Sequence, residues 1–219
     1  MTAYQTVSRM AEAELIVKKS RFIGQIAPAQ SPEAAMEFVA SIKAKHWDAS
    51  HNVWAYSLRE GQLRRYSDDG EPQGTAGLPA LDTLLKQELV DCVVVVTRYF
   101  GGTLLGTGGL TRAYGQAASA AIEAAGVVTM APCQVLRVAC DYGFYGALQR
   151  LIPAFAGTVL DTQFAGETTV TLRLRAEDAQ AFCKQLAEKS NGRVGAVRLH
   201  EEFAQICTST IFFLTNARK

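Results

Sequence analysis

The stretch from Val93 to Tyr114 constrains the fold of this chain more than any other segment. It opens with a β-branched run, Val93–Thr97, typical of a strand buried on both faces. A helix with apolar side chains at 3.6-residue spacing is predicted from Leu110 to Ala125. Between strand and helix stand the glycines Gly101, Gly102, Gly106, Gly108 and Gly109. This order exposes the backbone N–H groups of a helix N-terminus, which favour an anion.

Two interpretations of this glycine-rich loop stay open. Glycines permit tight turns and close packing without any ligand, and Arg98 and Arg112 could pair with acids such as Asp91 or Glu123 or lie solvated. Alternatively, the two guanidiniums bind phosphate in bidentate fashion. The loop is not a dinucleotide fingerprint, because Thr111 stands where G-x-G-x-x-G needs its third glycine. It is not a Walker loop either, since the chain has no Gly-Lys-Ser/Thr.

Length and composition predict a two-domain globular protein. The chain has 219 residues, 48% of them hydrophobic, and a net charge of +1, so whole-chain charge favours neither nucleic acid nor membrane. Five cysteines without a C-x-x-C carry no zinc or redox signature. The N-terminus does not resemble a signal peptide, and no apolar run approaches membrane-spanning length. We expect a cytoplasmic protein without cofactors.

The order of elements predicts an α+β fold with domains at residues 1–132 and 133–219. The first domain is expected to hold strands at 12–17, 21–27, 52–58, 63–67 and 93–97, and helices at 31–45, 78–89 and 110–125. Ala131–Cys133 breaks the pattern and marks the boundary. The order after it is βαββαβ, the ferredoxin-like pattern. A strand-like tail, residues 205–214, has no assigned place.

An acidic loop, Asp68–Pro79, is long and marked by glycine and proline, and such loops are often functional. Asp68, Asp69 and Glu71 could hold Mg²⁺ or act as acid and base, but turn chemistry also explains them. A Ser67–His51–Asp69 triad can be drawn on paper, although triads are recognised by geometry. We predict neither a metal site nor catalytic residues, and keep His51, Asp68, Asp69 and Glu71 as site candidates.

Basic residues gather beside aromatic residues at two further places, around Lys18, Lys19 and Arg21 and around Arg64–Tyr66. Such clusters suit phosphate contact combined with base stacking. Taken alone, each cluster is better explained as a solvated strand face, because charge runs usually lie in solvent.

Four segments of this chain, taken together and in this order, resemble the Impact family: Lys19–Gly24, Ala49–Asn52, Asp68–Pro79 and Val96–Tyr114. The resemblance implies an N-terminal domain with the ribosomal-protein S5 domain 2-like fold, which also occurs in domain IV of elongation factor G. It implies a C-terminal ferredoxin-like domain similar to domain V of that factor. Eukaryotic members regulate translation through a partner kinase pathway, largely with an RWD domain that this sequence does not contain. The family's signature residues map to His51, Asp68, Asp69, Glu71, Arg98, Tyr99, Gly101, Gly102, Gly106, Gly108, Gly109 and Arg112, without assigned roles.

We therefore expect a non-enzymatic, translation-associated factor that binds RNA, the ribosome or a ribosome-bound partner. Arg98, Arg112, Lys19 and Arg21 are the candidate phosphate contacts, with Tyr99 and the glycines beside them. No sequence-specific binding of DNA is expected. The alternative is a Mg²⁺- and nucleotide-dependent enzyme of small molecules that uses the glycine-rich loop and the acidic loop.

Overall fold

The structure is a computed structural model that describes residues 2–206. The chain divides into two compact units at Thr129/Met130, and each is described by itself. Most of the predicted tail at residues 205–214 lies outside the described residues. None of the helices in the described part is both long and apolar enough to cross a membrane.

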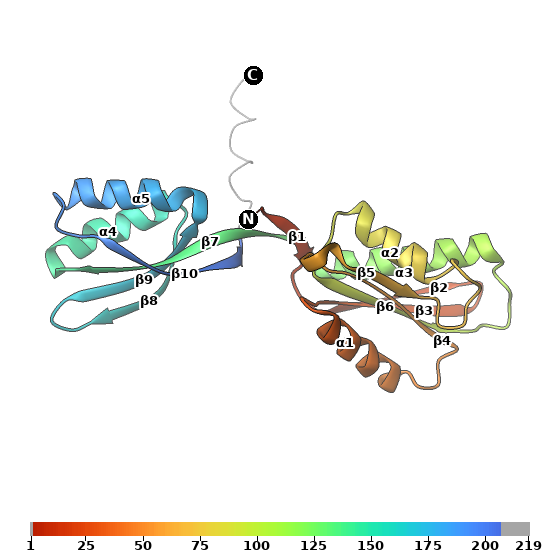
Figure 1. Cartoon of the computed structure of the whole chain (residues 1–219). Helices are drawn as coiled ribbons and strands as arrows, with labels where there is room; N and C mark the ends of the chain where they lie inside the picture. Colours follow the sequence, from red (N-terminus) through yellow and green to blue (C-terminus); the bar gives the residue numbers. More distant parts are fainter. Residues whose placement is uncertain (1, 207–219) are drawn as a thin grey trace, which may run out of the picture. The chain divides into compact units, whose positions relative to one another are not determined.

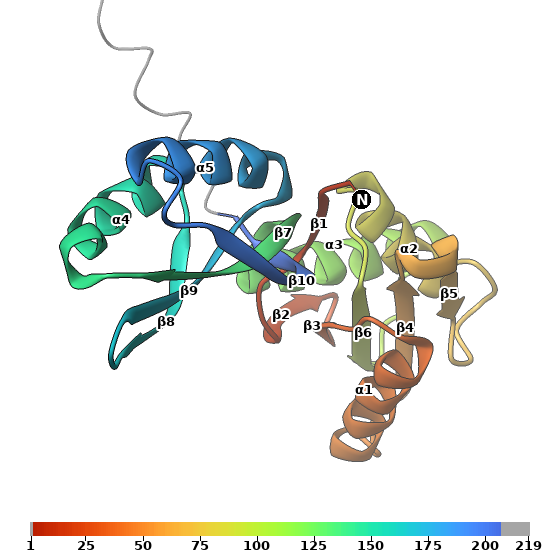
Figure 2. The ribbon, with the colours of Figure 1, turned by 60° about the vertical axis from the view of Figure 1, so that its left-hand side comes forward.

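The N-terminal unit is built on one antiparallel sheet with the strand order β2-β3-β6-β4-β5. Its strands are β2 (Ala11–Val17), β3 (Ser20–Pro28), β4 (His51–Ser57), β5 (Arg64–Ser67) and β6 (Cys92–Tyr99), and a 3₁₀ turn, Glu60–Gln62, precedes β5. One face carries α1 (Pro32–Lys45), and the other carries α2 (Gly77–Lys86) and α3 (Thr107–Ala125), as Figures 1 and 2 show. This confirms the mixed α+β class of the prediction.

Strand β6 is the centre of this sheet, with β3 on one side and β4 on the other. Val94 and Val96 pack into the core under α2 and α3, whereas Val93 and Val95 pack into the core under α1. All four side chains are fully buried. The β-branched run is therefore covered on both faces, as its composition predicts.

Helix α3 lies close to β3 because small residues meet at the contact. Its buried stripe is rich in alanine, including Ala117 and Ala121. A Cβ atom added to Gly24 of β3 would lie 2.3 Å from the main-chain oxygen of Ala117. The close approach brings the glycine-rich loop and the start of α3 beside the end of the sheet.

The C-terminal unit has the ferredoxin-like topology that the element order predicts. Its elements are β7 (Val127–Cys140), α4 (Tyr142–Ala154), β8 (Thr158–Phe164), β9 (Thr168–Arg175), α5 (Ala176–Lys189) and β10 (Ala196–Gln205). The strands are ordered β10-β7-β9-β8, with antiparallel neighbours. The short strand β1 (Tyr4–Val7), which pairs with β7, belongs to the N-terminal unit. Both helices cover one face of the sheet (Figure 1), around buried Leu148, Leu172 and Phe182.

Two glycine substitutions should separate close packing from helix propensity. Gly24→Ala should lower the free energy of unfolding by about 1–3 kcal/mol, because overpacking against a rigid backbone forces α3 away from β3. Gly108→Ala, in the first turn of α3 with open space around it, should be neutral or stabilise by about 0.5 kcal/mol. Urea unfolding of both variants measures the difference, and equal midpoints would contradict this account of the contact.

Candidate functional site

A pocket of about 400 Å³ opens beside the glycine-rich loop, at the C-terminal end of β6. It is lined by His51, Glu71, Pro72, Arg98, Phe100, Leu104, Leu105, Gly106, Thr107 and Leu110. These residues come from β4, the acidic loop, β6, the glycine-rich loop and α3. The pocket is thus the place where the predicted acidic, glycine-rich and histidine motifs meet.

The floor of this pocket is a buried ion pair between Arg98 and Glu71. Arg98 Nη1 donates to Glu71 Oε1, and Tyr114 Oη donates to the same oxygen at 2.8 Å. Arg98 is 5% exposed and Glu71 is 9% exposed. The partner of Arg98 is therefore neither Asp91 nor Glu123, the acids considered from the sequence, but an acid of the acidic loop. A buried charge needs such a partner, because leaving it alone costs several kcal/mol.

Aromatic rings complete the surroundings of the pair. The Arg98 guanidinium carbon lies 5.4 Å from the centroid of the Phe22 ring and 5.5 Å from that of Phe100. Phe22 meets Tyr114 edge-on, with centroids 5.2 Å apart. Burial, and then the negative charge of Glu71, raise the pKa of Tyr114 well above its ordinary value. Tyr114 is therefore a neutral donor to Glu71.

His51 lies opposite Arg98 in the β4–β6 register, and its two ring nitrogens have different surroundings. Nδ1 is 2.8 Å from the main-chain carbonyl oxygen of Asp69, which can only accept, so Nδ1 carries a proton. Nε2 lies 3.8 Å from Glu71 Oε1 and lines the pocket side. In a neutral ring Nε2 is then a hydrogen-bond acceptor.

The carboxylates of Asp68 and Asp69 are occupied by the protein itself. Asp68 accepts from the main-chain N–H groups of Gly74, Ala76 and Gly77, at 2.8–3.1 Å. Asp69 accepts from the Asn52 N–H at 2.7 Å and from Lys43 Nζ at 2.6 Å.

These bonds fold the acidic loop over the end of the sheet and present Glu71 to Arg98. The triad drawn on paper does not form, because His51 meets the Asp69 carbonyl, and Ser67 Oγ accepts from the Asp69 N–H. Within residues 2–206, no His, Cys, Asp and Glu side chains gather as metal ligands would.

The glycine-rich loop lies directly on the turn between β2 and β3. A Cβ atom at Gly101 would lie 2.0 Å from the carbonyl carbon of Lys19, and the Gly101 N–H donates to Ser20 Oγ at 3.1 Å. Gly102 and Gly106 have φ angles of 79° and 74°, a left-handed backbone that suits glycine. Gly106 is the N-cap of α3, and no side chain caps the N–H groups of its first turn.

The other predicted site residues are distributed around the pocket. Arg112 and Lys19 are exposed, and no ion pair engages them within the described chain. Arg21 is exposed and paired with Glu14 at 2.8 Å. Gly108 and Gly109 lie in the first turn of α3. Tyr99 points to the α1 face.

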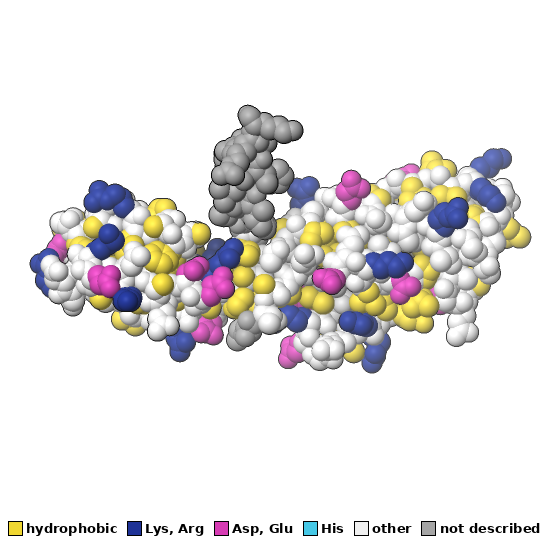
Figure 3. All heavy atoms as spheres, turned by 90° about the horizontal axis from the view of Figure 1, so that it is seen from above, with side chains coloured by type: hydrophobic (Ala, Val, Ile, Leu, Met, Phe, Trp, Pro, Cys, Tyr) yellow, Lys and Arg dark blue, Asp and Glu magenta, His cyan; other side chains and the backbone are white. Residues whose placement is uncertain are grey.

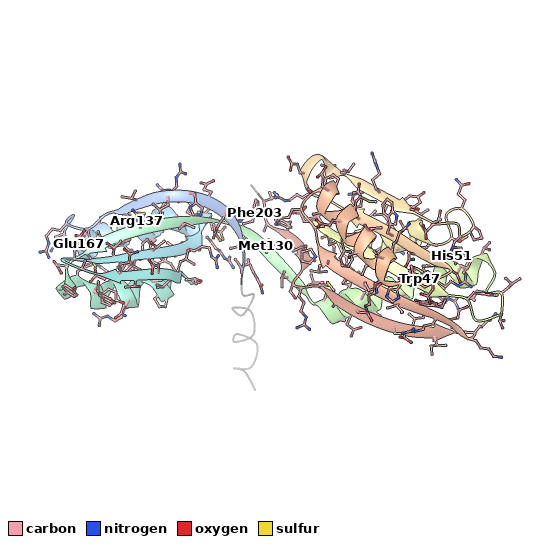
Figure 4. The ribbon with its side chains drawn as sticks, turned by 90° about the horizontal axis from the view of Figure 1, so that it is seen from below. Trp47, His51, Met130, Arg137, Glu167 and Phe203 are labelled. Atoms are coloured by element: carbon pink, nitrogen blue, oxygen red, sulfur yellow. The ribbon has the colours of Figure 1, made fainter. Side chains whose placement is uncertain are left out.

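On that α1 face, hydrogen bonds connect the sheet to the end of α1. Tyr99 Oη donates to Asp48 at 3.0 Å and lies 3.0 Å from His46 Nδ1, while Gln25 Nε2 lies 3.0 Å from His46 Nε2. Burial lowers the pKa of His46 and also raises that of Tyr99, so both groups are neutral. The next residue, Trp47, is 83% exposed, and Figure 4 shows it with His51 at the same end of this unit.

Among the site residues that sequence reasoning missed, Tyr114, Phe100 and Ser20 contact the ion pair or the glycine-rich loop. Tyr114 lies on the buried stripe of α3, and its hydroxyl reaches Glu71. A tyrosine among alanines on a buried helix face is a signal for such a bond, because a buried hydroxyl needs a partner. Phe100 and Ser20 have no comparable signal, since only the fold brings Ser20 to Gly101.

Substitution of the floor should show how far the site depends on its ion pair. Glu71→Gln should lower the free energy of unfolding by about 3–5 kcal/mol, since it leaves the Arg98 charge buried without a counter-charge. Glu14→Gln removes the same charge from the exposed pair with Arg21 and should leave the urea midpoint near that of the wild type. If both variants unfold at the same urea concentration, the pair is not what holds the acidic loop.

Comparisons with known proteins agree with this architecture. Residues 18–122 match the Impact N-terminal domain, and residues 138–193 match a domain of unknown function, DUF1949. The IMPACT family member YvyE of Bacillus subtilis is 35% identical, over 87% of this chain and 88% of that protein. The IMPACT family member YigZ of Escherichia coli is 34% identical, over 84% of this chain and 92% of that protein.

The chain is also similar to a solved structure described as a crystal structure of a hypothetical protein. It is 31% identical, with a TM-score of 0.59, and the match covers 91% of this chain and 98% of that one. The resemblance read from the four sequence motifs is therefore confirmed, and the chain belongs to the Impact family.

Proposed function

We propose that this protein is a translation-associated factor that binds single-stranded RNA, with ribosomal RNA as the expected target. The contact surface is the end of the N-terminal unit around the pocket, hereafter the loop end. It is formed by the β2–β3 turn, the end of α1, the glycine-rich loop and the first turns of α3. The observation that carries the proposal is that exposed rings and unpaired cations occur on this one end.

Exposed apolar side chains of the loop end suit base stacking. Trp47 is 83% exposed, Phe100 is 50% exposed and Leu104 is 83% exposed. Exposed rings of this kind are costly to leave in water and serve as platforms for bases, whatever their sequence. Hydrogen bonds of the His46 ring to Gln25 and Tyr99 fix the residue that precedes Trp47. The exposed indole therefore projects from a rigid part of the chain.

Exposed cations belong to the same end of the unit. Lys18 and Lys19 are exposed at the β2–β3 turn, against which Gly101 packs. Arg112 is exposed within the first two turns of α3. Within the described residues no carboxylate pairs with these three side chains. Figure 3 shows Lys and Arg side chains beside hydrophobic ones on the α2 and α3 side of the unit. Free cations beside rings fit a phosphate backbone with splayed bases.

Arg98 has a different role in this proposal from the one that the sequence suggested. Because Glu71 and two rings enclose it, it shapes the pocket floor, and the phosphate contacts come from Lys18, Lys19 and Arg112. The link to translation rests on the family resemblance, which implies folds shared with domains IV and V of elongation factor G.

Binding to a single-stranded RNA oligonucleotide should be measured by fluorescence anisotropy across a salt series. The affinity of the wild type should fall steadily with salt, as counterion release requires. Lys19→Ala and Arg112→Ala should each reduce the slope of log K against log salt by about 1. Trp47→Ala should cost about 1–3 kcal/mol of binding free energy.

Lys86→Ala is the matched control, because Lys86 is exposed at the end of α2 that leads to the start of β6, away from the loop end. It should bind as the wild type does. Binding that is absent, or equal in Lys86→Ala and Arg112→Ala, would overturn the proposal. Co-sedimentation with ribosomes that survives these substitutions would instead indicate a ribosomal protein as the partner.

A further inference from the structure

The pocket at the loop end has room for a small molecule. Its volume of about 400 Å³ falls in the range of small-molecule sites, which combine apolar walls with a few polar groups. Here the walls come from Phe100, Leu104, Leu105 and Leu110, and the polar groups come from the floor. Walls of this kind suit a flat, apolar-faced ring whose edge carries hydrogen-bonding groups.

The floor offers acceptors. Glu71 uses Oε1 for Arg98 and Tyr114, whereas no side chain or main chain of residues 2–206 donates to Oε2. In the neutral ring, in which Nδ1 donates to the Asp69 carbonyl, His51 Nε2 is a second acceptor. A ligand edge with two adjacent N–H donors would match these two acceptors.

The mouth offers donors instead. Gly106 and Thr107 line the pocket, and the N–H groups of the first turn of α3 have no side-chain cap. A helix of this length, Thr107–Ala125, presents partial positive charge there. Arg98, which is 5% exposed and belongs to the pocket floor, has its Nε buried away from the pocket and without a hydrogen-bond partner in the described chain.

We infer that this pocket binds one nucleotide, with the base inside and the phosphate at the N-terminus of α3. Guanine fits the floor best among the bases, because its N1–H and N2 amino group are adjacent donors for acceptors such as the Glu71 carboxylate. The nucleotide is either a free guanosine 5′-monophosphate or a guanine unit of a strand. If the guanine belongs to an RNA strand, this inference rests on the proposed function.

Calorimetric titration with guanosine 5′-monophosphate tests the pocket directly. The nucleotide should bind at least about tenfold more tightly than guanosine or inorganic phosphate alone, since each of these fills one part of the site. Adenosine and uridine 5′-monophosphates should bind more weakly than the guanine nucleotide. An absence of binding, or equal binding of all three nucleotides, would overturn the inference.

Charge at the mouth separates site binding from non-specific attraction. Thr107 is exposed in the first turn of α3, so Thr107→Glu should not harm folding, because an acid is favourable at that position of a helix. It should weaken binding of guanosine 5′-monophosphate by about tenfold or more through repulsion of the phosphate. Gln116→Glu adds the same charge to the exposed side of the same helix, about 13 Å further along, and should change the affinity by less than about twofold. Equal losses in the two variants would contradict a phosphate site at the mouth.

Two oligonucleotides distinguish the source of the nucleotide. A uridine strand with one central guanosine should bind more tightly than an all-uridine strand, and free guanosine 5′-monophosphate should abolish the difference. Guanosine 5′-monophosphate that binds when neither strand does would support the pocket with a free nucleotide as its ligand, and would overturn the proposed function. Strands that bind with equal, salt-dependent affinity, while the free nucleotide does not bind, would overturn the pocket and leave the proposed function standing.

Discussion

The ion pair between Arg98 and Glu71 is the interaction on which the loop end depends. Arg98 stands at the end of the central strand, between Phe22 and Phe100, where water is excluded. A guanidinium in such a place is unfavourable unless a carboxylate meets it. Glu71 does so from a loop that has no regular structure of its own, and Tyr114 adds a third group from α3. One oxygen atom thus connects the sheet, the acidic loop and the helix.

The rest of the loop end follows from this connection. Asp68 and Asp69 use their carboxylates on backbone N–H groups and on Lys43, which fixes the loop that presents Glu71. The glycines of the second loop let it lie on the β2–β3 turn. The buried cation is neutralised from within, so the positive charge that faces solvent comes from Lys18, Lys19 and Arg112. A chain with a net charge of only +1 can therefore still offer a local surface for phosphates.

Much of the fold was predictable because its signals are local. The β-branched run of β6, the apolar stripe of α3 and the βαββαβ order each depend on neighbours in sequence, and the structure confirms them. The site was only partly predictable. Periodicity places Arg98 on a strand and Glu71 in a loop, but the choice of Glu71 over Asp91 as its partner depends on tertiary contacts between residues 27 positions apart. The role of Tyr114 was hidden for the same reason.

The central claim is that RNA contacts the loop end through its exposed rings and the open N-terminus of α3. Nuclear magnetic resonance of the ¹⁵N-labelled protein during titration with the guanosine-containing uridine strand tests it most directly. The account predicts that the largest shifts fall on the Trp47 indole N–H and on the amides of Thr107, Gly108 and Gly109. Shifts confined to the C-terminal unit, or spread evenly over exposed lysines and arginines of both units, would contradict it.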